Sequence, residues 1–295
     1  MPALHPAPGF PRVAVVTVSY GSAQVLETFL ESMPAATRGP VVVIVVDNKP
    51  TAAANVEALT RSHDAQYLPL PENRGYGGAI NAAVRTLPPS IAWVLVSNPD
   101  LVLGAGSIDA LVAAGDADSN VASVGPAIVT DGEIYPSART IPSLRNGVGH
   151  ALFANMWQGN PWTQAYRQNS HHDQLPRDAG WLSGACVLVR RSLFDQVGGF
   201  DEGFFMYFED VDLGYRFGKL GFRNVYEPAA LVEHSGAHST DTDAESARMI
   251  AAHHDSALRF LGKKYSGPWL APVRVGLRLG LTVRSAVLKR KSGHH

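Results

Sequence analysis

The sequence has one cysteine, Cys186, among its 295 residues. A single cysteine excludes a disulfide within the chain and favours a reducing compartment such as the cytoplasm. The first ten residues also lack the basic and apolar regions of a secretory signal peptide. From these absences we expect an intracellular protein.

Long hydrophobic runs are missing as well. The longest aliphatic run, residues 41–46, is far too short to cross a bilayer and is typical of a buried strand. No internal repeat or low-complexity segment occurs. With 45% hydrophobic and 17% charged residues, the chain can form a full-sized core in one large domain or two small ones.

The net charge is only −1, but it is unevenly distributed. No acidic residue follows position 255, whereas nine basic residues do: Arg259, Lys263, Lys264, Arg274, Arg278, Arg284, Lys289, Arg290 and Lys291. The first 255 residues carry the other 16 Lys and Arg and all 26 acids, a formal charge of −10. A basic tail on an acidic body indicates contact with an anionic surface, either a membrane or a nucleic acid.

The first 130 residues alternate strand-like and helix-like segments. Strands are expected at 12–20, 41–48, 66–70 and 93–100, and helices at 23–33, 53–62 and from 75 onward. This order predicts an α/β fold, with a Rossmann-like, mostly parallel central sheet and helices on both faces. Later strands are expected at 181–189, 223–228 and 231–234, after a loop-rich insertion at 132–177 that shapes a pocket or covers the sheet.

Polar residues follow three of the expected strands, where ligands of parallel sheets bind. Asp47 and Asn48 can read a base or a ribose by hydrogen bonding, although an Asx turn explains them as well. Asp100, in Asn98-Pro99-Asp100, can bind a divalent cation together with diphosphate oxygens, because Mg²⁺ needs few protein ligands there. An ordinary turn is the alternative.

Three glycines in residues 73–81, namely Gly75, Gly77 and Gly78, stand where a loop leads into a helix. They would let backbone amides approach a diphosphate closely, and tight packing explains them equally well. The segment matches neither the Walker loop nor the dinucleotide fingerprint.

Four acids, Asp201, Glu209, Asp210 and Asp212, lie among aromatic residues near the start of a helix predicted at 208–220. Desolvation raises the pKa of such carboxyl groups, as a general base near neutral pH requires. The alternative is structural, since acids in a first turn stabilise the helix dipole. His234 follows an expected strand and is a further candidate ligand, with packing as its alternative; His171, His172, His253 and His254 are weaker metal candidates.

Taken in order, these segments resemble the family 2 glycosyltransferases of GT-A fold over about residues 12–262. The resemblance rests on Val-Thr-Val-Ser-Tyr20, Val-Asp47-Asn48, Asn73-x-Gly75 with Asn81, Asn98-Pro-Asp100, the block that starts at Ser183-Gly-Ala-Cys, Gly-Gly-Phe-Asp-Glu with Glu209-Asp210-Val-Asp212, and His234.

The resemblance implies a role for each matched residue. Tyr20, Asp47 and Asn48 would hold the nucleoside, and Gly75 and Asn81 would lie near the base or sugar. Asn98 replaces the first acid of the family's Asp-x-Asp motif.

Asp100 and His234 would then hold Mg²⁺ or Mn²⁺ by the same resemblance. Asp210 would be the general base, and Glu209 would orient it or a donor hydroxyl. Trp181, Tyr207 and Asp212 would contact the acceptor.

Four segments, 135–139, 160–167, 180–184 and 205–214, further resemble the actinobacterial rhamnosyltransferases of arabinogalactan linker synthesis. The implied activity is inverting transfer of L-rhamnose from dTDP-L-rhamnose to polyprenyl-diphosphate-linked N-acetylglucosamine. The resemblance also implies a peripheral protein at the cytoplasmic face of the plasma membrane, with no nucleic acid partner. A homo-oligomer is compatible with it. The alternatives are another donor, such as a galactofuranosyl or other deoxysugar nucleotide, and a non-catalytic nucleotide-sugar-binding scaffold.

The expected organisation has three parts. An N-terminal extension covers 1–11, and a GT-A domain covers 12–262, with a nucleotide-binding half at 12–130 and an acceptor half at 131–262. Residues 263–295 form a basic, membrane-associating extension. Its residues 273–283 alternate in a strand period, whereas membrane-surface anchors are more often helices, so its conformation stays open.

Overall fold

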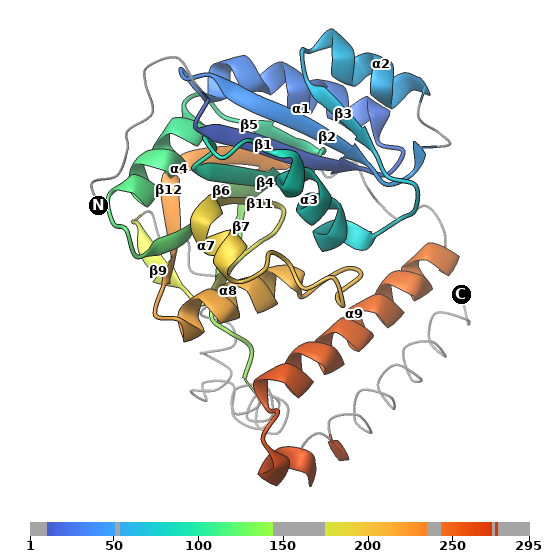
Figure 1. Cartoon of the computed structure of the whole chain (residues 1–295), viewed down its shortest axis with the longest axis vertical. Helices are drawn as coiled ribbons and strands as arrows, with labels where there is room; N and C mark the ends of the chain where they lie inside the picture. Colours follow the sequence, from blue (N-terminus) through green and yellow to red (C-terminus); the bar gives the residue numbers. More distant parts are fainter. Residues whose placement is uncertain (1–10, 51–53, 144–174, 235–242, 273–274, 277–295) are drawn as a thin grey trace.

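The computed structural model describes residues 11–50, 54–143, 175–234, 243–272 and 275–276 (Figure 1). The strands are β1 (Val13–Ser19), β2 (Val41–Asp47), β3 (Gln66–Pro69), β4 (Trp93–Ser97), β5 (Leu101–Leu103), β6 (Val121–Thr130), β7 (Glu133–Tyr135), β8 (Ala138–Arg139), β9 (Arg177–Ala179), β10 (Trp181–Leu182), β11 (Cys186–Arg190) and β12 (Arg223–His234). The helices are α1 (Ala23–Ala36), α2 (Ala54–Ser62), α3 (Gly75–Thr86), α4 (Ser107–Asp116), α7 (Arg191–Gln196), α8 (Glu209–Lys219), α9 (Asp243–Lys264) and the 3-10 turn η3 (Pro268–Leu270).

The central sheet runs in the order β3-β2-β1-β4-β11-β6-β12-β5, with β7 beside β6 and β9 beside β12. The first four strands in this order are parallel, as is the β6–β12 pair, and β11 runs antiparallel between β4 and β6. The predicted α/β class, with a mostly parallel central sheet, is therefore confirmed.

Helices cover both faces of this sheet because its strands are apolar on both sides. In β1, Val13 and Val15 pack with α1 and α4, whereas Ala14 and Val16 pack with α3, α7 and α8. Figure 1 shows α1 and α2 above the sheet and α3, α7 and α8 below it. Alternate residues of a strand point to opposite faces, so one buried run supports two separate cores.

Prolines account for two differences from the expected strands. The strand expected at 93–100 ends at Ser97, two residues before Pro99, and β5 begins only after it. Pro228 lies within the irregular part of β12, between Glu227 and Leu231, so two expected strands form a single bent one. Proline lacks the N–H that a sheet ladder needs, which restricts it to breaks and bulges.

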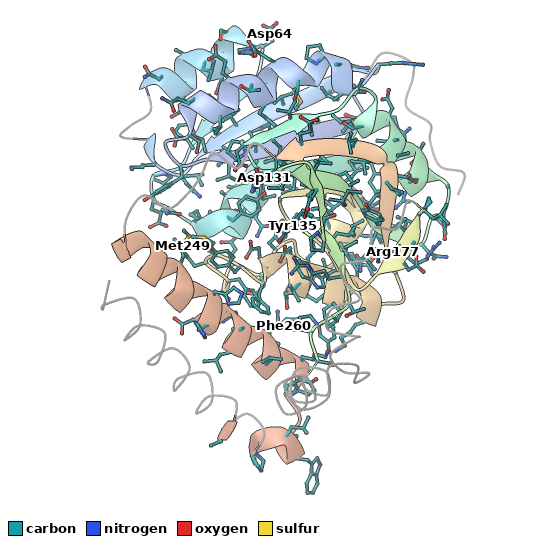
Figure 2. The ribbon with its side chains drawn as sticks, turned by 180° about the vertical axis from the view of Figure 1, so that it is seen from behind. Asp64, Asp131, Tyr135, Arg177, Met249 and Phe260 are labelled. Carbon is teal, nitrogen blue, oxygen red and sulfur yellow. The ribbon has the colours of Figure 1, made fainter. Side chains whose placement is uncertain are left out.

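Helix α9 crosses the end of the domain and packs on the loop before α8. Phe260 is fully buried against Phe204 and Val211. Met249 and Phe260 are labelled at two levels along α9 in Figure 2. The helix continues past residue 262, where the basic extension was expected to start.

Basic residues of α9 bind acids of the domain. Lys263 bonds to Asp201 at 2.8 Å and to Asp212 at 2.5 Å, and Arg259 bonds to Asp201 at 3.0 Å. Burial alone would raise the pKa of Asp201, but hydrogen bonds from Lys263 and the Gly203 N–H lower it to about 2. Three of the nine basic residues near the C-terminus therefore serve the fold, since Lys264 donates to the Pro142 carbonyl at 2.6 Å.

Two sequence-based interpretations fall outside the described residues. They are the motif at 160–167, with His171 and His172, and the alternating stretch of the tail beyond residue 276. Among the described residues, no helix combines the length and apolar character needed to span a bilayer.

We expect Phe260→Ala to lower the free energy of unfolding by about 3–5 kcal/mol, because the substitution leaves a cavity between α9 and the loop before α8. Denaturant unfolding measures this change. Trp269→Ala is the control: it removes a larger ring that is 91% exposed and should change stability by less than about 0.5 kcal/mol. A Phe260→Ala midpoint equal to that of wild type would show that α9 does not pack as described.

Candidate active site

The carboxyl ends of β1, β2 and β4 meet at one edge of the sheet. In register, Ser19 pairs with Asp47 and Thr17 pairs with Ser97, which brings Tyr20, Asn48 and Asn98 to the same edge. Tyr20 is 56% exposed, and the ammonium group of Lys49 lies 5.0 Å from its ring centre. This edge is where the sequence predicts nucleoside binding.

Asp47 is buried and has two protein partners. One carboxylate oxygen accepts a hydrogen bond from the Lys49 N–H at 2.8 Å, which forms an Asx turn after β2. The other accepts from the Tyr67 hydroxyl at 2.9 Å, and burial together with this bond raises the pKa of Tyr67 to about 12. Asp47 is thus held rigidly, and its contact with a nucleoside stays a prediction.

Asn48 connects this edge to the glycine segment. Its amide nitrogen donates to the Gly75 carbonyl at 3.1 Å, and its buried Oδ1 has no hydrogen-bond partner within the described ranges. A buried acceptor without a partner is costly, so this oxygen suits an N–H or O–H donor of a ligand.

Gly75 allows two loops to touch. Its φ is +71°, and a Cβ at this position would collide with the carbonyl oxygen of Phe205. The neighbouring Tyr76 N–H donates to that same carbonyl at 3.1 Å. The glycine-rich segment is therefore packed against the loop that carries the acids. This agrees with the alternative that its glycines serve tight packing.

Asp100 and His234 lie together at another point of the sheet edge. Asp100 precedes β5 and His234 ends β12, and the antiparallel pairing of these strands aligns His234 with Leu101. The His234 Nε2 lies 2.9 Å from the Asp100 Oδ2, and Asp100 is 6% exposed. The two residues predicted to hold the metal are thus adjacent.

A carboxylate and an imidazole fit a divalent cation that takes its remaining ligands from a diphosphate. In the part of the chain that the structure describes, no group of three His, Cys, Asp or Glu side chains could hold a metal alone. The donor set therefore fits a cation that depends on its nucleotide-sugar ligand.

A short chain of backbone contacts joins this region to the acids of α8. The Asn98 N–H donates to the Ala185 carbonyl at 2.8 Å, and the Gly184 N–H donates to the Asp210 Oδ2 at 2.9 Å. A Cβ on Gly184 would lie 3.3 Å from that of Asp210, so glycine permits this close approach.

Tyr76 lies close to several of these groups. Its hydroxyl donates to the Gly184 carbonyl at 2.8 Å. Burial raises the pKa of Tyr76 well above its usual value, and the nearby charges of Glu209, Asp210 and Asp100 raise it further. The predicted metal-binding acid and the predicted base thus surround one tyrosine, which sequence reasoning missed although it lies between Gly75 and Gly77.

Glu209 and Asp210 form a coupled pair at the start of α8. Burial, and then the charge of Asp210, raise the pKa of Glu209 to about 8. Burial also raises the pKa of Asp210, while hydrogen bonds from the N–H groups of Gly184 and Val211 lower it. Such tuned carboxyl groups are typical of general acid–base sites.

The backbone before this pair is strained. Tyr207 and Phe208 have φ values of +68° and +66°, in the left-handed region that non-glycine residues rarely adopt. Strain of this kind costs about 1–3 kcal/mol for each residue and clusters at functional sites. It agrees with a loop shaped to present Glu209 and Asp210.

Two predicted ligand contacts are engaged with the protein instead. Asn81 bonds to both the N–H and the carbonyl of Phe200, and to Glu202. Asp212 is fully buried and pairs with Arg216 at 2.7 Å and with Lys263. Asp212 therefore lies in an internal ion network, where its carboxylate is not exposed to an acceptor.

The two aromatic acceptor candidates each contact another part of the protein. The Trp181 Nε1 donates to the Thr140 carbonyl at 3.1 Å, and its Cα and Cβ lie close to Gly214 of α8. The Tyr207 hydroxyl lies 3.1 Å from the sulfur of Met249 on α9. Both are partly exposed, and their contact with an acceptor stays a prediction.

The model of the family described as "Glycosyltransferase like family 2" matches residues 11–251. The chain therefore belongs to glycosyltransferase family 2 and is a glycosyltransferase. It is 46% identical over 288 residues to the N-acetylglucosaminyl-diphospho-decaprenol L-rhamnosyltransferase of Mycobacterium tuberculosis, covering 94% of this chain and 93% of that relative. Rhamnosyltransferase WbbL of Escherichia coli K12 is 39% identical over 84 residues, 28% of this chain and 31% of that protein.

Solved structures show the same fold at low identity. The mannosyltransferase PcManGT of Pyrobaculum calidifontis, in complex with GDP-Man and Mn²⁺, is similar with a TM-score of 0.57 and 18% identity. The match covers 99% of this chain and 82% of that one. GalNAc-T7, with UDP, GalNAc and Mn²⁺, also has a TM-score of 0.57, at 11% identity, over 81% of this chain and 48% of its own. The GT-A fold is thereby confirmed.

We expect Glu209→Gln to increase stability more at alkaline than at acidic pH. Because the pKa of Glu209 is raised from 4.5 to about 8, the folded state holds a proton that the unfolded state loses, and stability falls as pH rises through this interval. The variant removes that loss. Relative to wild type, its free energy of unfolding should rise between about pH 5 and pH 9 by roughly 1–3 kcal/mol, as measured by denaturant unfolding.

Glu202→Gln is the control of opposite sign. Burial opposes the shift, but Asn81 and the charges of Arg74 and Arg85 lower the pKa of Glu202, so its charge stabilises the fold above the pKa of the unfolded chain. This variant should lose stability at neutral pH. A Glu209→Gln effect that is constant between the two pH values would contradict a raised Glu209 pKa.

Proposed function

We propose that the chain is an inverting rhamnosyltransferase that moves L-rhamnose from dTDP-L-rhamnose to polyprenyl-diphosphate-linked N-acetylglucosamine. Identity of 46% along nearly the full length of both chains to the mycobacterial rhamnosyltransferase supports this donor and acceptor. The observation that carries the chemistry is the contact of one short segment, Gly184–Ala185, with both Asp210 and Asn98, two residues before Asp100.

Asp210 acts as the general base in this proposal. Two backbone N–H groups hold its carboxylate, so it can accept the proton of the acceptor hydroxyl without reorienting. Burial and the charge of Asp210 raise the pKa of Glu209 to about 8, so Glu209 keeps its proton near neutral pH, which prevents two adjacent negative charges.

At the other side of the site, Asp100 and His234 would hold Mg²⁺ or Mn²⁺. Such a cation, when bound, supplies positive charge that stabilises the departing diphosphate. Asn98 stands in place of a second acid, and its backbone N–H ties this turn to Ala185. The pair therefore carries one carboxylate, and the diphosphate supplies much of the negative charge that attracts the cation.

The nucleoside would lie against Tyr20, Asp47 and Asn48, with the unpartnered Oδ1 of Asn48 accepting from it. The alternative donors, galactofuranosyl or other deoxysugar nucleotides, would use the same residues. Transfer assays with a panel of dTDP- and UDP-sugars separate them: faster transfer from a UDP-sugar than from dTDP-L-rhamnose would overturn the proposed donor.

We expect Asp210→Asn to lower the transfer rate by roughly 10²- to 10⁴-fold, the usual contribution of a positioned base, with dTDP-L-rhamnose binding retained. The asparagine oxygen can still accept from Gly184, so the variant should fold. Steady-state transfer and calorimetric donor binding measure the two effects. Asp195→Asn, at an exposed acid paired with Arg191, is the control and should keep near wild-type rates. Near-normal turnover of Asp210→Asn would assign the base elsewhere.

Because the acceptor is anchored in a lipid, we place the enzyme peripherally at the cytoplasmic face of the membrane. Three of the nine late basic residues belong to the fold, which leaves Arg274, Arg278, Arg284, Lys289, Arg290 and Lys291 for an anionic surface. Trp269, 91% exposed on η3, lies just before them, and tryptophan favours the membrane interface. Each basic residue near an anionic surface contributes about 1 kcal/mol.

We expect changing these six residues to glutamine to reduce sedimentation with phosphatidylglycerol vesicles at low salt, with little difference at high salt, because salt screens the attraction. The full-length variant keeps Trp269 and α9, so only charge differs. Wild-type protein with neutral phosphatidylcholine vesicles is the control. Equal sedimentation of variant and wild type with anionic vesicles would refute the role of the tail.

A further inference from the structure

Arg139, on β8, has its guanidinium group fixed between two aromatic rings. Its carbon Cζ lies 5.3 Å from the ring centre of Tyr135 and 5.6 Å from that of Trp181. Its Nε donates to the Pro136 carbonyl at 2.7 Å and its Nη2 to the Tyr135 hydroxyl at 3.2 Å. Figure 2 shows Tyr135 in the middle of the face seen there, between Asp131 and Phe260.

Among the residues that the structure describes, no acid forms an ion pair with this guanidinium group. Arg216, Arg223 and Arg259 each form an ion pair with an aspartate, whereas within the described ranges Arg139 forms none. Arg139 is partly exposed, and Tyr135 is 41% exposed. A pre-oriented, unpaired guanidinium group at the surface is suited to bind a phosphate through two parallel hydrogen bonds.

The segment 181–185 fixes where Arg139 lies relative to the reacting groups. Trp181 pairs with Arg139 across the β8–β10 ladder, the Gly184 N–H holds Asp210, and the Ala185 carbonyl accepts from Asn98, two residues before Asp100. Burial raises the pKa of Asp210, and the positive charge of Arg139 partly opposes this effect. Along this segment, the contact with Arg139 comes first, at Trp181, followed by the contact with Asp210 at Gly184 and the contact with Asn98 at Ala185.

This order matches the two diphosphates of the proposed reaction. The donor diphosphate belongs with Asp100 and His234. The acceptor carries its own diphosphate on the anomeric carbon, one sugar ring away from the hydroxyl that Asp210 deprotonates.

We propose that Arg139 binds the diphosphate of the lipid-linked acceptor, an inference that rests on the proposed function. In this arrangement the acceptor sugar lies between Arg139 and Asp210, next to Trp181.

The test compares Arg139→Gln and Arg139→Lys with wild type, using two acceptors: a short-chain prenyl-diphosphate N-acetylglucosamine and a neutral alkyl N-acetylglucosaminide. We expect Arg139→Gln to raise KM for the diphosphate acceptor about tenfold or more, the usual effect of losing a charge-assisted hydrogen bond. KM for dTDP-L-rhamnose and transfer to the neutral acceptor should stay within about twofold of wild type, and Arg139→Lys should recover part of the loss, since lysine keeps the charge without the planar geometry. Arg61→Gln, at an exposed arginine that pairs with Glu57, is the control.

Other outcomes overturn the inference. A raised KM for dTDP-L-rhamnose would assign Arg139 to the donor diphosphate, and an equal loss with the neutral acceptor, with a shifted pH profile, would mean that Arg139 acts through Asp210. Unchanged KM values for both substrates would show that Arg139 binds neither diphosphate. If Arg139→Gln does not fold, Arg139→Lys must still raise KM for the diphosphate acceptor alone.

Wild-type protein separates this inference from the proposed function. Lack of rhamnosyl transfer to the diphosphate acceptor by wild type counts against the proposed function. In that case, calorimetric binding of the same acceptor to wild type and Arg139→Gln still decides the inference, which fails if the two affinities are equal.

Discussion

The hydrogen bond from the Gly184 N–H to Asp210 joins the two parts of the candidate active site: the sheet edge near Asn98 and the start of α8. It links the β10–β11 connection, which runs along the sheet edge beside Asn98, to the first turn of α8. The glycine lets the two segments approach within van der Waals contact. Because the same segment also pairs with β8, the positions of Arg139, Asp210 and Asp100 all depend on this one backbone path.

A second constraint holds α8 from outside. Helix α9 buries Phe260 against the loop before α8, and Lys263 bonds to both Asp201 and Asp212. The loop between these acids contains two residues with left-handed backbone conformations, Tyr207 and Phe208. A strained loop persists only where its surroundings determine its shape. The C-terminal helix is thus part of what presents Glu209 and Asp210.

The sequence predicts strands and helices well where one physical signal dominates. The β-branched runs of β1, β2 and β4 and the apolar stripe of α8 each predict the element that forms there. The motif resemblance also predicts that Asp100 and His234 lie together, as they do. The direction of polar side chains is harder to predict. Asp212 follows Asp210 by two positions and has the same chemistry, yet only the positions of Arg216 and Lys263 reveal that it points inward. Asn81 and Tyr76 depend likewise on residues more than 100 positions away.

The local surroundings also decide which acid of the coupled pair is the base. Glu209 is buried and Asp210 is half-buried, and two adjacent carboxyl groups in such a setting do not both ionise readily. Asp210 receives hydrogen bonds from the Gly184 and Val211 N–H groups, which stabilise its charged form, whereas the Oε2 of Glu209 has no partner among the described residues. In the proposed mechanism, these contacts favour the proton of the pair on Glu209 and the negative charge on Asp210. Since a general base must be ionised and correctly oriented before the acceptor binds, these backbone hydrogen bonds support the proposed role of Asp210.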